Sequence, residues 1–202
     1  IKSLMKRFIF YISLSFLINY NYLFAYSTQP KLFVNELVND IVSVLSETST
    51  PVKDKNKKIE EIAKENVDIS ALGLYTLGSL RKTLDKEKLN EYNDLFSKYF
   101  LKSLTSRLTD YSSQKFEIID EEQKSANYTI VNSKIASSDK NPEIKISWRI
   151  YTKNPEKPLI RDLIVEGLSL AKTQKEEFAS ILNSNNNDIN ALLNKLKEFV
   201  SN

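Results

Sequence analysis

The spacing of apolar residues changes twice along this chain, and this change limits the possible folds more than any other feature. From residue 33 to about residue 108, apolar side chains recur every three or four positions, which is the period of an amphipathic helix. Between residues 115 and 165 they alternate with polar side chains, as in half-buried strands. From residue 178 the helical period returns. The sequence therefore predicts an α+β fold of helices, then strands, then helices.

The helical segments have start signals. Pro30 opens the first helix, Thr50 followed by Pro51 suits an N-cap, and Asp68 suits another. Gly73 and Gly78 fall inside the third predicted helix, where we expect another backbone to approach closely. The helices predicted before the strands are residues 30–45, 51–66, 69–83 and 85–111.

Four strands are expected, and the short segments between them favour hairpins and an antiparallel sheet. Their ranges are residues 115–120, 128–135, 143–152 and 159–165. After the sheet, Thr173 and Glu176 suggest a capping box for one helix. Asp188 suggests the N-cap of a final helix that carries Leu192 and Leu196.

Residues 1–27 have the pattern of a secretory signal peptide. Lys2, Lys6 and Arg7 precede an apolar run, and Ala25 and Ser27 place small residues at positions −3 and −1 of a cut before Thr28. We therefore predict one domain over residues 28–202. The alternative is a retained anchor, which would make the chain a membrane-anchored structural protein of the envelope. The clean apolar run, residues 8–18, is shorter than the ~20 residues that span a bilayer.

Composition excludes several classes of function. The chain has no cysteine and no histidine, which removes disulfides, Cys nucleophiles, His general bases and nearly all transition-metal sites. Without the three basic residues of residues 1–27, the 29 Lys and Arg fall to 26 and equal the 26 Asp and Glu. A balanced charge gives no electrostatic case for binding nucleic acid. We expect no metal and no cofactor.

Four short patterns occur in an order that resembles a known family. They are Leu77-Gly78 with Arg81, a long helix with Phe96 and Phe100, the run from Trp148 to Val165-Glu166-Gly167-Leu168-Ser169-Leu170, and Phe178 with a closing Leu192-Leu193-Leu196 helix. Together they resemble the MlaC family of periplasmic phospholipid-binding proteins, also called toluene-tolerance auxiliary proteins. The chain departs from the family at Ser79 and Leu80, where an aromatic residue is usual, and at an Asn run, residues 185–187.

The resemblance implies a periplasmic carrier and not an enzyme. Such a carrier would shuttle phospholipid between an outer-membrane lipoprotein complex and an inner-membrane ABC transporter with a periplasmic substrate-binding ring. The implied fold is a curved antiparallel four-stranded sheet, packed by N- and C-terminal helices around an apolar lipid pocket.

Lipid transfer sets a physical requirement on any such pocket. Lifting a two-tailed lipid out of a bilayer exposes ~30 methylenes, which costs ~24 kcal/mol at about 0.8 kcal/mol each. A carrier must therefore enclose the tails in apolar surface. The residues that we expect to line the pocket are Leu77, Phe96, Phe100, Trp148, Val165, Leu168 and Leu170.

An enzyme remains the alternative from another class. It would use a pocket carboxylate such as Asp162 or Glu166 on a cone-shaped α+β fold, and it would need that carboxyl group to have a raised pKa. An ion pair with Arg149 is the simpler account of Asp162, and a capping or solvated role is the simpler account of Glu166. Arg81 suits either a lipid phosphate or a structural salt bridge.

Overall fold

The computed structural model of this 202-residue chain describes residues 26–108, 115–137 and 142–202, and it shows the predicted α+β fold. The signal peptide was predicted over residues 1–27, and residues 1–25 of it lie outside the described residues. The helices are α2 (Pro30–Ser46), α3 (Val52–Asn66), α4 (Ile69–Thr76), the 3₁₀ helix η1 (Gly78–Lys82), α5 (Lys86–Leu108), α6 (Leu170–Asn183) and α7 (Ile189–Ser201). The strands are β1 (Phe116–Ser125), β2 (Tyr128–Ile135), β3 (Ile144–Tyr151), β4 (Leu159–Val165) and β5 (Leu168–Ser169).

The sheet is an antiparallel meander with the strands in sequence order, and it has five strands where four were predicted. The additional strand is β5, which pairs with β4 through a two-residue turn. Glu166 and Gly167 form this turn with φ angles of 48° and 81°, the positive values that tight hairpins require. The Glu166 carboxylate also accepts a hydrogen bond from the backbone N–H of Lys145. The turn thus brings Leu168 back beside Val165.

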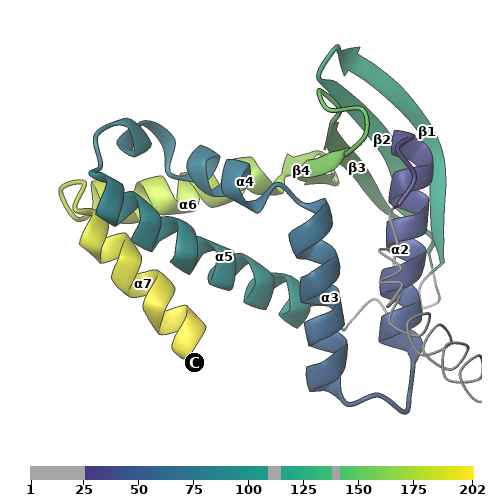
Figure 1. Cartoon of the computed structure of the whole chain (residues 1–202), viewed down its shortest axis with the longest axis horizontal. Coiled ribbons are helices and arrows are strands. Elements are labelled where there is room, and N and C mark those ends of the chain that lie inside the picture. Colours follow the sequence, from purple (N-terminus) through teal and green to yellow (C-terminus); the bar gives the residue numbers. More distant parts are fainter. Residues whose placement is uncertain (1–25, 109–114, 138–141) are drawn as a thin grey trace, which may run out of the picture.

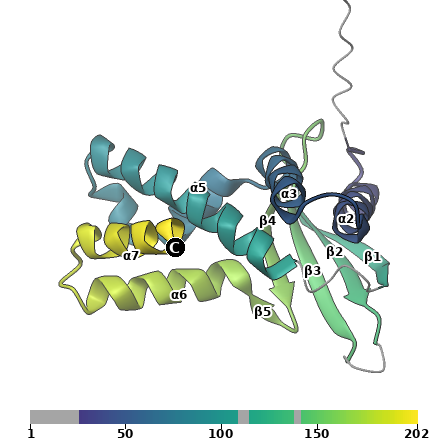
Figure 2. The same ribbon diagram turned by 90° about the horizontal axis from the view of Figure 1, so that it is seen from below.

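Helix α2 covers one face of the sheet (Figure 1, Figure 2). Its apolar stripe has the helical period, so one side of the helix faces the strands along its whole length. The buried residues of this sheet core are Phe33, Val34, Leu37 and Val38 of α2 with Val131, Trp148, Ile150 and Ile160 of the strands.

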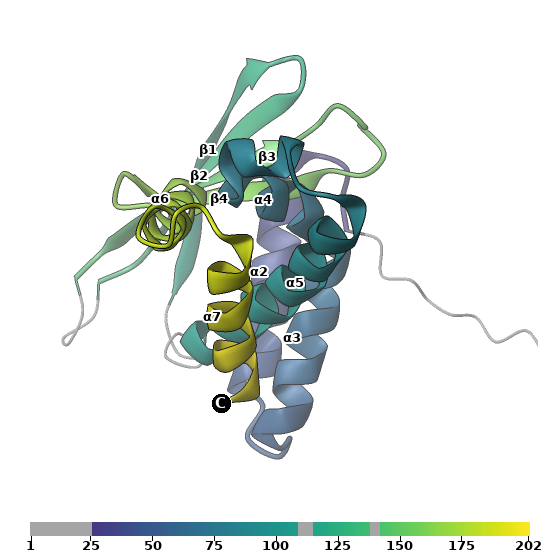
Figure 3. The same cartoon turned by 90° about the vertical axis from the view of Figure 1, so that its left-hand side faces the viewer.

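A second core lies among the helices α4 to α7, to one side of the sheet (Figure 1, Figure 3). Phe96 is its centre, with ring centroids 5.9 Å from Tyr92, 6.3 Å from Phe100 and 6.3 Å from Phe178. The buried residues of this helical core are Leu77, Tyr92, Phe96, Phe178, Leu182, Ile189, Leu192, Leu193 and Leu196.

Strand β4 holds the helical part to the sheet. The backbone N–H of Asp68 donates to the carbonyl of Ile160 at 2.9 Å, and the Asp68 carboxylate receives Nε and Nη2 of Arg161 at 2.8 and 2.7 Å. Two residues further on from Ile160, Asp162 accepts hydrogen bonds from Ser169 Oγ at 2.6 Å and the backbone N–H of Ala171 at 3.0 Å. The start of α4 and the start of α6 are therefore both fixed to β4.

Three predicted helix ends were wrong. The helix predicted over residues 69–83 ends at Thr76, because Gly78 has a φ of 65° and the chain continues as a 3₁₀ turn. Helix α6 begins at Leu170 and is capped by Ser169, whose hydroxyl accepts from the N–H of Lys172, so Thr173 and Glu176 are no capping box. Helix α3 begins at Val52 after Pro51, and no side chain caps it.

The strand predicted over residues 115–120 was too short, since β1 continues to Ser125, where it pairs with Tyr128. Several other predicted boundaries were confirmed or lie outside the described residues. Pro30 opens α2, and Asp68 and Asp188 cap α4 and α7 with their side chains. The predicted helix end near residue 111 and most of the loop over residues 137–141 fall outside the described residues. None of the described helices has the length and hydrophobicity needed to cross a bilayer.

Gly73 allows α4 and α5 to pack closely, but the neighbour is a ring and not the backbone that was expected. A Cβ at residue 73 would lie 2.9 Å from Cδ1 of Phe96. We predict that Gly73→Ala destabilises the protein, since overpacking a core costs about 1–3 kcal/mol and exceeds the helix-propensity gain of up to about 1 kcal/mol. Urea unfolding measures the change.

The matched control is Ser70→Ala, because Ser70 is exposed on the same helix. It should change the free energy of unfolding by less than about 0.5 kcal/mol. A Gly73→Ala protein as stable as the wild type would contradict this account of the packing.

Candidate functional site

The strand register assigns apolar side chains from all five strands to one face of the sheet. Residues that pair directly in an antiparallel sheet point to the same side. One such row crosses the whole sheet, from Ile118 through Ser133, Ile146 and Val165 to Leu168. A neighbouring row carries Val131, Trp148 and Leu163, so α2 packs against the same face that these rows form.

Helix α2 covers only part of this face. Val131 and Ile150 are fully buried and Trp148 is 7% exposed. Further along the strands, Ser133 and Ile135 of β2 remain buried, whereas the residues of the neighbouring strands on this face are half-buried. At the edge, Leu168 is 68% exposed. We call this half-covered region the open end of the apolar face. It consists of Phe116, Ile118, Ile144, Ile146, Leu163, Val165 and Leu168.

Trp148 lies at the border between the covered part and the open end, and hydrogen bonds fix its orientation. Its indole Nε1–H donates to Ser133 Oγ at 2.8 Å, and that hydroxyl donates in turn to the carbonyl of Ile146 at 3.0 Å. The ring of Phe116 meets the indole edge-on, with centroids 6.1 Å apart. The polar atom of this buried ring is thus satisfied, and the rest of the indole presents apolar surface.

The structure does not bring the seven predicted lining residues together. Trp148 and Val165 lie on the apolar face of the sheet, and Leu168 lies at its exposed edge. Leu170, at the start of α6, is 43% exposed. The other three belong to the helical core, where Leu77 and Phe96 are buried and Phe100 is half-buried against them.

Several residues of the open end were not among the predicted lining residues. Ile146 is two positions before Trp148 in the alternating strand, and Ile118 follows Phe116 in the same way. That alternation could have selected them, because a strand with one apolar face presents every second side chain to it. What the sequence could not show is which part of the face α2 leaves uncovered.

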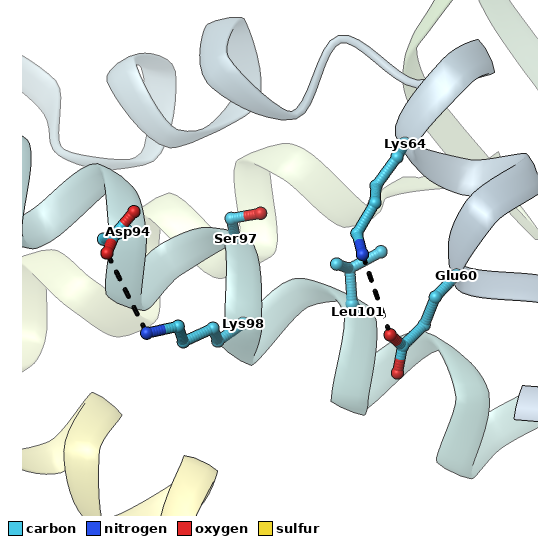
Figure 4. A pocket seen from close by; sticks show the side chains of 6 residues that line it. All are labelled: Glu60, Lys64, Asp94, Ser97, Lys98 and Leu101. Carbon is cyan, nitrogen blue, oxygen red and sulfur yellow. Dashed lines mark ion pairs between the residues drawn. The ribbon is translucent and has the colours of Figure 1, made fainter. Parts of the chain in front are cut away.

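Two hollows on the described surface have linings that mix polar and apolar residues. One of about 340 Å³ lies between α3 and α5, where Glu60 pairs with Lys64 and Asp94 pairs with Lys98 along their own helices, above Leu101 (Figure 4). Another of about 170 Å³ lies between η1 and α6, beside Leu77, Lys175 and Asn187. Neither is the deep apolar pocket that the resemblance implies.

The charged groups considered for catalysis or phosphate binding have structural partners. Asp162 is buried and accepts hydrogen bonds from Ser169 and Ala171. Arg149 instead lies over the ring of Tyr128, at 5.9 Å from its centroid. The expected ion pair between Arg149 and Asp162 is therefore not formed among the described residues. The guanidinium of Arg81 donates to the carbonyl of Gly78 within its own turn. Among the described residues, no group of three acidic side chains is placed to hold a metal ion.

Arg161 has a shifted pKa. Burial by itself would lower the pKa of its guanidinium, but hydrogen bonds to Tyr128 and Asp68 outweigh burial and raise it. The guanidinium also stacks on Tyr151, 3.4 Å from the ring centroid. The Arg161 guanidinium therefore attaches α4 to β4 through Asp68.

Comparisons with known proteins give one matching family model, one relative and one solved structure of similar fold. The family model described as MlaC protein matches residues 35–198. The intermembrane phospholipid transport system binding protein MlaC of Haemophilus influenzae is 21% identical over 182 residues, which cover 86% of this chain and 83% of that protein. A solved structure of a phospholipid-binding protein from Ralstonia solanacearum, in complex with a phospholipid, has a TM-score of 0.69. It is 16% identical to this chain, and the match covers 88% of this chain and 97% of the chain in that structure, which shows a likeness of fold.

The hydrogen bond that orients Trp148 can be tested directly. We predict that Ser133→Ala destabilises the protein by about 1–3 kcal/mol, because the buried indole N–H loses its acceptor. Trp148 is the only tryptophan, so its fluorescence reports the change without interference. Ser147→Ala is the matched control, since Ser147 bonds Asn132 on the other face of the same strands. Equal effects of the two substitutions would refute the proposed role of Ser133.

Proposed function

The chain belongs to the MlaC family, and from this we propose that it is a periplasmic carrier that holds the acyl tails of a phospholipid against the open end of its apolar face. The observation that carries the proposal is the graded exposure of that face. Its side chains pass from fully buried at Val131 to 68% exposed at Leu168, with no described element covering the edge. An exposed apolar face that continues into a core suits a hydrophobic ligand.

The size of the ligand requires movement. The ~24 kcal/mol that two exposed tails would cost can be offset only by enclosing them. Because neither of the two described hollows is a deep apolar pocket, we propose that the helical part moves away from the sheet when lipid enters. The attachments at Asp68–Arg161 and at Asp162 lie along β4 and would stay intact during this motion.

The seven predicted lining residues take different roles in this proposal. Trp148 and Val165 form the wall on the sheet side, and Leu168 and Leu170 form the mouth. Leu77, Phe96 and Phe100 belong to the helical core and would contribute the opposite wall once the two parts separate. No catalytic group is assigned, since the carboxylates of Asp162 and Glu166 hold backbone N–H groups.

The proposed partners follow from the family and from the Haemophilus influenzae relative, whose name places that protein in an intermembrane phospholipid transport system. We propose that this chain exchanges phospholipid with an outer-membrane lipoprotein complex on one side. On the other side it would meet an inner-membrane ABC transporter with a periplasmic substrate-binding ring. Its export would depend on the signal peptide proposed for the first residues.

Adjacent residues of β4 that point to opposite faces provide a sharp test of the wall. We predict that Val165→Asp lowers the phospholipid recovered with the purified protein at least tenfold, because a carboxylate on the apolar face opposes the tails. Ile164→Asp, one residue away on the opposite face and also half-buried, should retain it. Mass spectrometry of organic extracts measures the lipid, and circular dichroism verifies folding. Wild-type protein without phospholipid would overturn the proposed function.

The mouth can be tested by kinetics. We predict that Leu168→Glu combined with Leu170→Glu slows phospholipid transfer between vesicles by about tenfold or more, since tails would cross two charges on leaving the bilayer, while lipid already bound is retained. Val52→Glu is the matched control, because Val52 is 62% exposed at the distant start of α3. An unchanged rate in the double variant would show that the lipid leaves elsewhere.

A further inference from the structure

The residues just before α2 are built into the fold. The ring of Tyr26 packs against the sheet core and meets Phe33 edge-on, with centroids 6.2 Å apart. Its hydroxyl donates to the Asp40 carboxylate at 2.8 Å. Tyr26 therefore extends the cover that α2 provides, and its loss would uncover part of that core.

Ser27 prepares the start of α2. Its hydroxyl accepts from the N–H of Gln29 at 3.2 Å, and its own N–H donates to the Glu36 carboxylate at 2.6 Å. These bonds matter because Gln29, the N-cap residue, makes no side-chain cap, and the first turn of α2 has no acidic residue. Ser27 thus ties the entering chain to the second turn of the helix.

Carboxylates surround this short segment. Burial, the hydrogen bond to Asp40 and the charges of Asp40, Glu65 and Glu36 together raise the pKa of the Tyr26 phenol. In the described structure none of these three carboxylates has a Lys or Arg within ion-pair distance. A positive charge at Tyr26 would be favourable here.

Of two cleavage positions, the one before Thr28 would remove these contacts and the one before Tyr26 would keep them. A cut before Thr28 removes Tyr26 and Ser27 and puts the new ammonium group beside the positive end of α2. The Glu121 carboxylate accepts from the N–H of Lys31 at that end, at 2.9 Å, and the ammonium would compete for it. A cut before Tyr26 keeps the packed ring and puts the ammonium one residue before Ser27, whose N–H donates to the Glu36 carboxylate.

We propose that a leader peptidase of the export machinery cleaves after Ala25, so that Tyr26 is the first residue of the mature protein. Hydrolysis adds one water across the Ala25–Tyr26 peptide bond and leaves a carboxylate on Ala25 and an ammonium on Tyr26. Ala25 supplies the small residue at position −1, while the larger Leu23 stands at position −3. The small-residue pattern alone favours the bond before Thr28, but that cut discards two residues that the fold uses. This inference depends on export and not on lipid binding.

The test is the mass of the exported protein. The full chain is expressed in a Gram-negative host, purified from the periplasm and measured by intact-mass spectrometry, with N-terminal sequencing to fix the first residue. We expect Tyr26. A start at Thr28 or at any other residue, or a chain that keeps residues 1–25, overturns the proposal.

A second measurement tests the physical reason. Proteins made to begin at Tyr26 and at Thr28 are compared by urea unfolding, and the longer one should have an unfolding equilibrium constant about tenfold smaller, as expected for losing a partly buried ring and its hydrogen bonds. Within the longer protein, Tyr26→Ala should remove most of the difference, and Thr28→Ala, at an exposed position, should not. Equal stability of the two proteins would overturn the stated reason for the cut.

Discussion

The structure depends on shielding the apolar face of the sheet from water. With no cysteine in the chain, burial is what holds the strands and helices together. One helix of 17 residues supplies the cover, and it packs mainly against β1 and β2, so the far edge of the five-stranded sheet is left open (Figure 2). Its stripe from Phe33 to Val38 buries Val131, Ile150 and Ile160 and stops near Trp148. The open end, the exposed Leu168 and the use of Tyr26 as added cover all follow from this mismatch between one helix and a wide sheet.

Strand β4 connects this sheet to the second core. A bulge at Arg149 and Ile150 lets β4 place Arg161 and Asp162 in succession, with one side chain holding Asp68 of α4 and the other holding the start of α6. Helical packing around Phe96 therefore has its own apolar contacts, while Asp68 and Asp162 attach it to β4 by polar contacts and α3 packs against α5. A fold with two cores and one shared strand is suited to separating them, which is the motion that the proposed carrier requires.

Much of the fold was predictable because its signals are local. Pro30, Asp68 and Asp188 begin helices as expected, and the alternation around Trp148 gives β3 and its facing partners. A prediction failed where a residue distant in the sequence makes a contact that local signals do not show. Ser169 caps α6, whereas the predicted cap was Thr173, one turn later. The helix begins early because the Asp162 carboxylate on β4 accepts a hydrogen bond from the N–H of Ala171. The lining role predicted for Leu77 and Phe96 stays a prediction. In the described structure they pack with Phe178, and a 3.6-residue period does not say which partner fills the stripe.

The sequence by itself determined the α+β class, the order of the strands and the family resemblance, because periodicity, caps and short motifs are properties of neighbouring residues. The tertiary structure decided which apolar residues are covered. Trp148 and Leu168 are both apolar positions in the same motif, yet one is buried under α2 and the other is exposed at the sheet edge. It also gave Tyr26 a place in the sheet core, where the leader pattern assigned it to a discarded peptide. Burial depends on contacts between residues far apart in the chain, and no local pattern encodes where one helix ends on a sheet.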